Sequence, residues 1–300
     1  MKKTIKMIAL LLVLIFGAAS CSTSHVDGTE GNTMEEVRPV ILVVSFGTSY
    51  NSTRDKTIGA IERKIDAAYG DEYDVRRAFT SQFIINKLAT RDNLIIDNME
   101  MALQRCIDDG VTTLVVQPTH VMAGSEDDDM VQTVKEYADK FERVSIGTPL
   151  LTTPQNYRDA VKILTDVTSS YDDGDTSIVY MGHGTQHPGN ITYANLQTYV
   201  DEAGFGDRYF IGTVEATPTL EDMINKAEES GNDRVVLRPF MIVAGDHANN
   251  DMAGDEAGSW KTEFKKAGFD VECVIEGLGE ISAIQDMFVS KTSEAIAALQ

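Results

Sequence analysis

The chain has 300 residues, of which 42% are hydrophobic and 24% charged, and its formal net charge at pH 7 is −21. This composition excludes a disordered chain and a polytopic membrane protein, and the length suffices for one large α/β domain or two smaller ones. The strong negative charge argues against nucleic-acid binding, which requires a positively charged surface, so we expect no nucleic-acid partner.

The N-terminus has the pattern of a secretory signal peptide. Three lysines in Met1–Lys6 precede an apolar run, Met7–Phe16, that is too short for a comfortable membrane span. Small residues and then Cys21 follow, which is similar to a bacterial lipobox in which Ala18 replaces the more usual leucine. We expect a signal peptide over 1–20 and a lipidated tether over 21–38, with Cys21 as the lipidated residue.

These features predict an exported protein, either periplasmic or an outer-membrane lipoprotein, that contacts a membrane through its lipid anchor. Ordinary secretion after signal cleavage and a retained anchor are the alternatives.

From Pro39 onward, apolar segments of strand length alternate with amphipathic segments of helix length. The expected strands are Val40–Ser45, Asp74–Phe79, Thr112–Gln117, Arg143–Gly147, Ser177–Met181, Arg208–Thr213, Arg234–Arg238 and Asp270–Ile275. The expected helices are Ser52–Ala68, Asn98–Asp109, Asp128–Phe141, Pro154–Thr168, Thr219–Glu229, Ser259–Lys266 and Ser282–Leu299. This alternation predicts parallel strands with crossover helices on both faces of the sheet.

The two halves of this region also resemble each other. The segment "VVSFGTS" (43–49) matches "VYMGHGTQ" (179–186), and "VVQPTHVMAGSE" (115–126) matches "VLRPFMIVAGDH" (236–247). We therefore predict two similar α/β subdomains with parallel sheets flanked by helices, an N-terminal one over 39–160 and a C-terminal one over 161–300. Ligands bind at the carboxyl ends of such strands, so we expect a cleft between the subdomains.

Three side chains in the second half follow predicted strand ends. His183 lies between two glycines, Glu215 follows the next strand, and His247 comes after a glycine beyond a third strand. Two imidazoles and a carboxylate suit a divalent first-row metal with open coordination positions, and the same groups suit general base catalysis near neutral pH. Isolated polar loop residues are the alternative, but corresponding positions at strand ends favour one shared site.

Other polar residues lie at related positions. His120 is expected to face the cleft from the first half as a substrate-contacting or axial group, with a buried core histidine as the alternative. Glu126 is a candidate cleft residue because it matches His247 in the repeat. His187 is expected on an exposed loop, with a supporting partner of His183 as the alternative.

The cysteines and the nucleotide-binding motifs are less informative. Cys106 and Cys273 are as consistent with two buried thiols as with one disulfide, and the sequence leaves their pairing open. The chain has neither a P-loop nor a dinucleotide-binding GxGxxG motif, and no GxSxG motif of a hydrolase nucleophile.

Taken together, seven segments resemble the anaerobic sirohydrochlorin cobaltochelatases, which are class II, ferrochelatase-like tetrapyrrole chelatases. These segments are "ILVVSFGTSYNSTRDKTIGAIERKI", "RAFTSQFIINKL", "QPTHVMAG", "YMGHGTQH", "GTVEATP", "MIVAGDHANNDMAGDEAGSWK" and "GLGE". The resemblance extends from Pro39 to the C-terminus and implies a chelatase-like fold of two α/β subdomains around a tetrapyrrole cleft. It also implies a His-Glu-His metal site, which corresponds here to His183, Glu215 and His247.

The resemblance implies ATP-independent insertion of Co²⁺ into sirohydrochlorin or a related tetrapyrrole in cobalamin biosynthesis, with Fe²⁺ or Ni²⁺ as alternative metals. His183 and His247 are then catalytic, and His183 is both a metal ligand and a proton acceptor. The residues expected to contact the substrate are Phe46, Thr48, His120, Met122, Glu126 and Ala244.

Other questions stay open at this point. The alternative function is a non-catalytic exported protein that binds haem, another tetrapyrrole or a metal, with His120 as an axial haem ligand. Arg54, Arg77 and Arg238 are candidate partners for the ring carboxylates. The sequence leaves open whether the chain forms a homo-oligomer.

Overall fold

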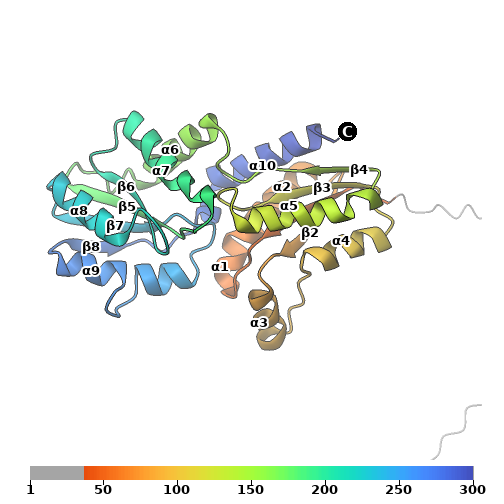
Figure 1. Cartoon of the computed structure of the whole chain (residues 1–300), viewed down its shortest axis with the longest axis horizontal. Helices are drawn as coiled ribbons and strands as arrows, with labels where there is room; N and C mark the ends of the chain where they lie inside the picture. The colour runs from red at the N-terminus through yellow and green to blue at the C-terminus, as the bar shows by residue number, and fades with distance from the viewer. Residues whose placement is uncertain (1–36, 300) are drawn as a thin grey trace, which may run out of the picture. The chain divides into compact units, whose positions relative to one another are not determined.

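Within residues 37–299, which the computed structural model describes, the backbone forms two four-stranded parallel sheets (Figure 1). The first sheet has the order β2-β1-β3-β4 and consists of β1 (Val40–Ser45), β2 (Asp74–Phe79), β3 (Thr113–Pro118) and β4 (Arg143–Ile146). The second has the order β6-β5-β7-β8 and consists of β5 (Thr176–Gly182), β6 (Tyr209–Thr213), β7 (Arg234–Pro239) and β8 (Asp270–Cys273). The predicted α/β fold with two similar parallel sheets is confirmed. The predicted signal peptide, Cys21 and most of the predicted tether lie outside the described residues.

Helices connect the strands and cover both sheets. They are α1 (Asn51–Lys56), α2 (Ile58–Tyr69), α3 (Gln82–Asp92), α4 (Met99–Asp108), α5 (Ser125–Tyr137), α6 (Pro154–Thr168), α7 (Ile191–Glu202), α8 (Leu220–Ser230), α9 (Trp260–Lys266) and α10 (Ser282–Ala297). Short helical turns are η1 (Ala138–Lys140), η2 (Pro188–Asn190), η3 (Ala248–Met252) and η4 (Leu278–Glu280). None of the helices in 37–299 combines the length and the apolar character that a membrane crossing requires.

The helix prediction was incomplete at three places. Helices α3 and α7 were not predicted, although each has buried apolar residues at helical spacing. In α3 this pattern is obscured because Phe83, beside the buried Ile85 and Leu88, is 73% exposed. The helix predicted over 52–68 is divided into α1 and α2 at Thr57, a fully buried residue whose ψ of −85° is not helical.

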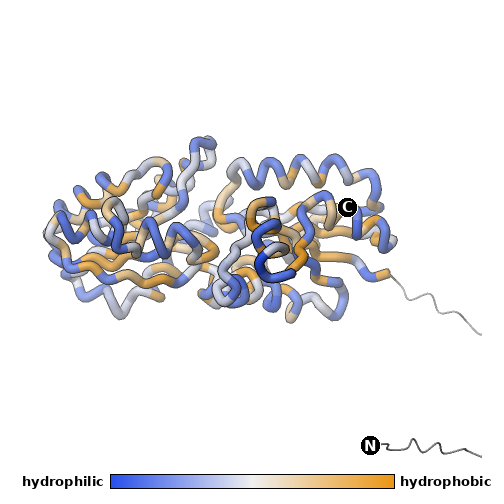
Figure 2. The backbone as a smooth tube through the Cα atoms, turned by 90° about the horizontal axis from the view of Figure 1, so that it is seen from below, coloured by the Kyte–Doolittle hydropathy of each residue, from blue (hydrophilic) through white to orange (hydrophobic). Residues whose placement is uncertain are grey.

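The core forms layers on both faces of the sheets. Strand β1 is buried along its whole length, because its alternate side chains pack into different layers. Ile41 and Val43 belong to a cluster that also includes residues of α2, α6, α7 and α10, whereas Leu42 and Val44 pack with residues of α4 and α5. Figure 2 shows the resulting pattern, with hydrophobic strands inside and hydrophilic segments on the helices. Cys106 in α4 and Cys273 in β8 are free thiols.

The last helix, α10, returns to the first half of the chain. It packs against α2, β3 and β4 of that half and also contacts α6 (Figure 1). Its buried Lys291 donates hydrogen bonds to Thr148 Oγ1, Thr152 Oγ1 and Asn156 Oδ1 at 3.0–3.1 Å, and burial lowers the pKa of this lysine. Through these bonds α10 contacts the segment that joins the two sheets. Helix α6 belongs to this segment and spans residue 160, where the sequence analysis placed the subdomain boundary.

We predict that Phe288→Ala destabilises the whole fold, since Phe288 of α10 is fully buried in the cluster that includes residues beside both sheets. Truncating a buried phenylalanine costs about 3–5 kcal/mol. Urea unfolding followed by circular dichroism measures the change. Ser293→Ala, at an exposed position of the same helix, is the control and should change the free energy of unfolding by less than about 0.5 kcal/mol. Equal stability of the two variants would contradict the role assigned to α10.

Candidate metal centre

His183 leaves the end of β5 on a turn that requires glycine on both sides. A Cβ atom on Gly182 would lie 2.1 Å from the ring of Tyr193 in α7, and Gly184 has a φ of +85°, which L-residues with side chains rarely adopt. The Gly184 N–H donates to Tyr193 Oη at 3.2 Å, and burial raises the pKa of that tyrosine. Close packing against α7 therefore determines where the His183 side chain emerges.

The loop after β6 is joined to the same turn by backbone hydrogen bonds. Val214 N–H donates to the Gly182 carbonyl at 3.0 Å, and Glu215 N–H donates to the His183 carbonyl at 2.9 Å. The parallel pairing of β5 with β6 thus continues past the ends of both strands. It places Glu215 Oε2 3.9 Å from His183 Nδ1.

The third residue comes from the loop after β7, on the other side of β5. His247 directly precedes the turn η3, and its ring lies edge-on to the His183 ring with the centroids 4.7 Å apart. One nitrogen or oxygen atom from each of His183, Glu215 and His247 lies within 4.8 Å of the others. The structure therefore brings together all three residues that the sequence placed in one site, and all three are at least partly exposed.

Hydrogen bonds orient the two imidazoles. His183 Nδ1 lies 2.7 Å from the Gly184 carbonyl oxygen, and His247 Nδ1 lies 2.6 Å from Asp251 Oδ2. In the tautomer in which each Nδ1 donates to this carbonyl or carboxylate oxygen, each Nε2 keeps its lone pair for a cation. Asp251 was missed in the sequence because it lies outside every predicted strand and helix. The structure forms η3 there, and the i,i+4 spacing from His247 to Asp251 was the available signal.

These residues open into a cleft of about 880 Å³ that is lined by both halves of the chain. Among the predicted substrate-contacting residues, those that line it are Phe46, Thr48, His120, Met122 and Glu126. Ala244 differs, because it is 2% exposed and is absent from the cleft lining, whereas Val243 and Gly245 on either side line the cleft. The reason is local packing: the backbone at Gly277 lies against residues 242–244.

Two further histidines have partners outside the cluster of three. His120 Nδ1 lies 3.3 Å from Asp127 Oδ1, and its buried Nε2 has no partner among the described residues. His187, expected on an exposed loop, is instead partly buried and lies 3.2 Å from Asp128 Oδ2 in α5. This second pair connects the two halves of the chain beside the cleft.

Comparisons with known proteins agree with this architecture. Residues 39–297 match the family described as "Cobalt chelatase (CbiK)". A sirohydrochlorin cobaltochelatase of Salmonella typhimurium is 38% identical over 260 residues, which cover 87% of this chain and 97% of the relative. The sirohydrochlorin cobaltochelatase CbiKC of Nitratidesulfovibrio vulgaris is 29% identical over 262 residues, covering 86% of this chain and 91% of the relative.

Solved structures show the same fold at low sequence identity. SirB from Bacillus subtilis with Fe³⁺ matches with a TM-score of 0.60 and 15% identity, covering 87% of this chain and 96% of that one. CbiX, described as the terminal enzyme for siroheme biosynthesis in denitrifying bacteria, matches with a TM-score of 0.51 and 13% identity, covering 86% and 99%. These likenesses support the chelatase-like fold predicted from the sequence.

We predict that Asp251→Asn weakens binding of a divalent metal ion by about 10- to 100-fold, because the variant loses the carboxylate that orients His247 and raises its basicity. Equilibrium dialysis of the full chain with Co²⁺ measures the affinity. Asp255→Asn is the matched control, since this nearby carboxylate is exposed and pairs with Lys261. The assignment fails if both variants bind Co²⁺ as the wild type does.

Proposed function

Because this chain belongs to the cobalt chelatase (CbiK) family, we propose that it inserts Co²⁺ into sirohydrochlorin or a closely related tetrapyrrole without ATP. One observation carries the proposal: His183, Glu215 and His247 converge within 4.8 Å in the wall of a cleft of about 880 Å³. Clefts of this size are typical of small-molecule and cofactor sites.

The substrate metal needs ligands that hold it and then release it. Two neutral imidazoles and one carboxylate bind first-row divalent ions and leave coordination positions open. Ring nitrogens then replace the protein ligands one at a time. The partial exposure of all three side chains supports this exchange, because the incoming ring and the metal must reach the same atoms.

Insertion also removes two protons from the pyrrole nitrogens of the ring. A group that has released the metal regains a lone pair and is suited to accept one of them. We assign this role to His183, whose Nδ1–H is held by the Gly184 carbonyl so that Nε2 is the accepting atom. Glu215, 3.9 Å from the same ring, is suited to accept the second proton. His247 completes the metal site and shares the catalytic role, with Asp251 orienting its ring.

The cleft supplies the other half of the reaction by holding the macrocycle. Phe46 and Met122 of the first half offer apolar contact to a flat ring, and they line the same cleft as the residues of the second half that hold the metal. We propose that Thr48, His120 and Glu126 contact polar groups of the substrate. We propose that no nucleotide takes part, because the sequence has neither a P-loop nor a dinucleotide-binding GxGxxG motif.

The same three ligands determine which metal ions the site can bind. Imidazole and carboxylate ligands also accept Fe²⁺ and Ni²⁺, so we propose Co²⁺ as the main substrate metal and these two as alternatives. We further propose that the chain is exported and anchored through Cys21, on the strength of the basic start, the short apolar run and the lipobox-like segment.

A second candidate function is haem binding without turnover, through His120. The observation that favours it is the buried Nε2 of His120, which has no partner among residues 37–299 and belongs to a cleft-lining residue. Haem titration followed by absorption spectroscopy tests it. A low-spin Soret shift that disappears in His120→Ala supports axial ligation, and an identical spectrum in the variant excludes it.

We predict that His183→Ala lowers the rate of cobalt insertion by about a hundredfold or more, since it removes both a metal ligand and a proton acceptor. The purified full chain is mixed with sirohydrochlorin and Co²⁺ without ATP, and the change in ring absorption gives the rate. His187→Ala is the matched control, because this histidine lies four residues away but outside the cluster of three. A His183→Ala rate equal to that of the control would refute the proposed function.

A further inference from the structure

Sirohydrochlorin has carboxylate side chains around its rim, yet this chain has a net charge of −21. Four acidic residues also line the cleft: Glu126, Asp127, Glu215 and Asp246. A polyanionic ring therefore needs a local cation to enter the cleft, because like charges that face each other at an interface are unfavourable. The following inference rests on the proposed function and asks which residue meets those carboxylates.

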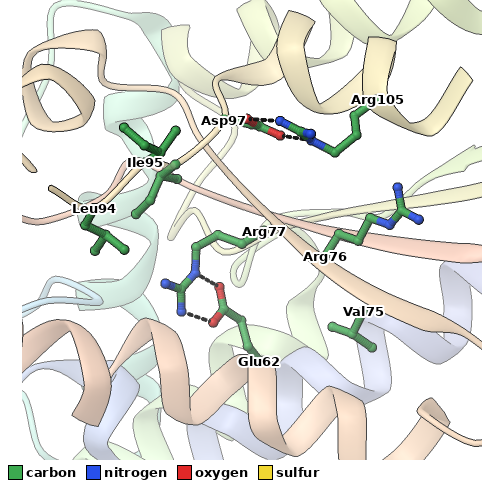
Figure 3. Close-up of a pocket in the computed structure, with 9 residues that line it drawn as sticks. Glu62, Val75, Arg76, Arg77, Leu94, Ile95, Asp97 and Arg105 are labelled. Atoms are coloured by element: carbon green, nitrogen blue, oxygen red, sulfur yellow. Dashed lines mark hydrogen bonds and ion pairs between the residues drawn. The ribbon is translucent and has the colours of Figure 1, made fainter. Parts of the chain in front are cut away.

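Two of the three arginines considered from the sequence are already neutralised. Arg238 is buried and forms an ion pair with Glu276. Arg77 is not among the residues that line the cleft; it lines a separate pocket, where it forms a bidentate ion pair with Glu62 (Figure 3). In that same pocket Arg105 pairs with Asp97 at 2.6 and 2.9 Å. Carboxylates of the protein therefore already balance the charges of Arg77 and Arg105.

Lys87 of α3 differs from these arginines in two ways. Among the residues that line the cleft it is the single lysine or arginine, and no carboxylate of residues 37–299 forms an ion pair with it. Its Nζ lies 5.9 Å from the ring centre of Phe83, one helical turn earlier, and Phe83 also lines the cleft. An exposed aromatic ring and a free ammonium group thus lie side by side at the rim.

A second basic residue on the same face of α3, Arg91, ties this helix to the cleft. Arg91 follows Lys87 by four residues, and its Nη2 donates to the Ser49 carbonyl at 2.5 Å. Ser49 belongs to the loop after β1 that lines the cleft. Arg54, the third arginine considered, donates to the neighbouring Thr48 carbonyl at 3.3 Å. Both guanidinium groups hold the cleft loop, but neither arginine lines the cleft. Among the described residues that do line it, Lys87 is the lysine or arginine that can meet a ring carboxylate.

We propose that Lys87 and Phe83 form a subsite at the rim of the cleft that binds a peripheral carboxylate of the tetrapyrrole and the adjoining edge of the macrocycle. Lys87 supplies the charge and Phe83 the apolar contact. The subsite favours rings with many carboxylates over rings with few. It lies on the half of the chain that does not hold the metal, so it orients the ring without taking part in metal transfer.

The test measures binding of uroporphyrin, a metal-free polycarboxylate porphyrin, by its fluorescence with the full chain at several salt concentrations. Lys87→Glu should weaken binding by about three- to tenfold at low salt, and the difference should largely vanish at high salt because screening removes the charge effect. Lys87→Arg should retain most of the affinity. Phe83→Ala should weaken binding at all salt concentrations. The matched control is Lys56→Glu, which reverses the charge of an exposed lysine of α1 outside the cleft lining.

Cobalt insertion into sirohydrochlorin is measured separately with the same proteins. If Lys87→Glu and Lys56→Glu bind uroporphyrin equally while the wild type inserts cobalt, the subsite is wrong and the proposed function stands. If the salt-dependent loss is seen only in Lys87→Glu but the wild type inserts no metal, the subsite stands and the proposed function fails. A wild type that neither binds uroporphyrin nor inserts cobalt overturns both.

Discussion

The parallel pairing of β5 with β6 on one side and β7 on the other is the constraint on which the site depends. Because all three strands end at the same edge of the sheet, the loops that carry His183, Glu215 and His247 must emerge together. Two backbone hydrogen bonds beyond the strand ends, from Val214 to Gly182 and from Glu215 to His183, continue this order into the loops. The close packing of Gly182 against Tyr193 then restricts the backbone direction at the turn that carries His183.

The two halves share a topology but divide the chemistry between them. In the repeated segments Phe46 corresponds to His183, and Glu126 corresponds to His247. The first half thus presents an exposed aromatic ring and a carboxylate where the second half presents imidazoles, and all four side chains line the same cleft. This asymmetry fits a reaction with two partners, in which one wall holds a cation and the other contacts a flat ring. Helix α10, which crosses back to the first half and binds the connecting segment through Lys291, keeps the two walls in one compact unit.

Much of this arrangement could be predicted from the sequence, and the failures have physical causes. Continuous apolar strands such as β1 identify a parallel sheet, and residues just after such strands identify its functional edge. Asp251 escaped because a segment rich in small and acidic residues predicts a loop, whereas the fold winds it into η3. Lys87 and Phe83 were not predicted as site residues because α3 itself was not predicted. Its apolar residues lie on both its buried and its exposed side, which obscures the helical pattern. Burial of Ala244 depends on Gly277, which is distant in sequence, so local pattern carried no signal for it.

The central claim is that one Co²⁺ ion is shared by three side chains from three strand ends. X-ray absorption spectroscopy at the cobalt edge, on the full chain loaded with a single equivalent of Co²⁺, tests it most directly. The account predicts scattering from two imidazole rings together with oxygen ligands, and the loss of one ring in each of His183→Ala and His247→Ala. A spectrum with oxygen ligands alone, or one that neither substitution changes, would contradict it.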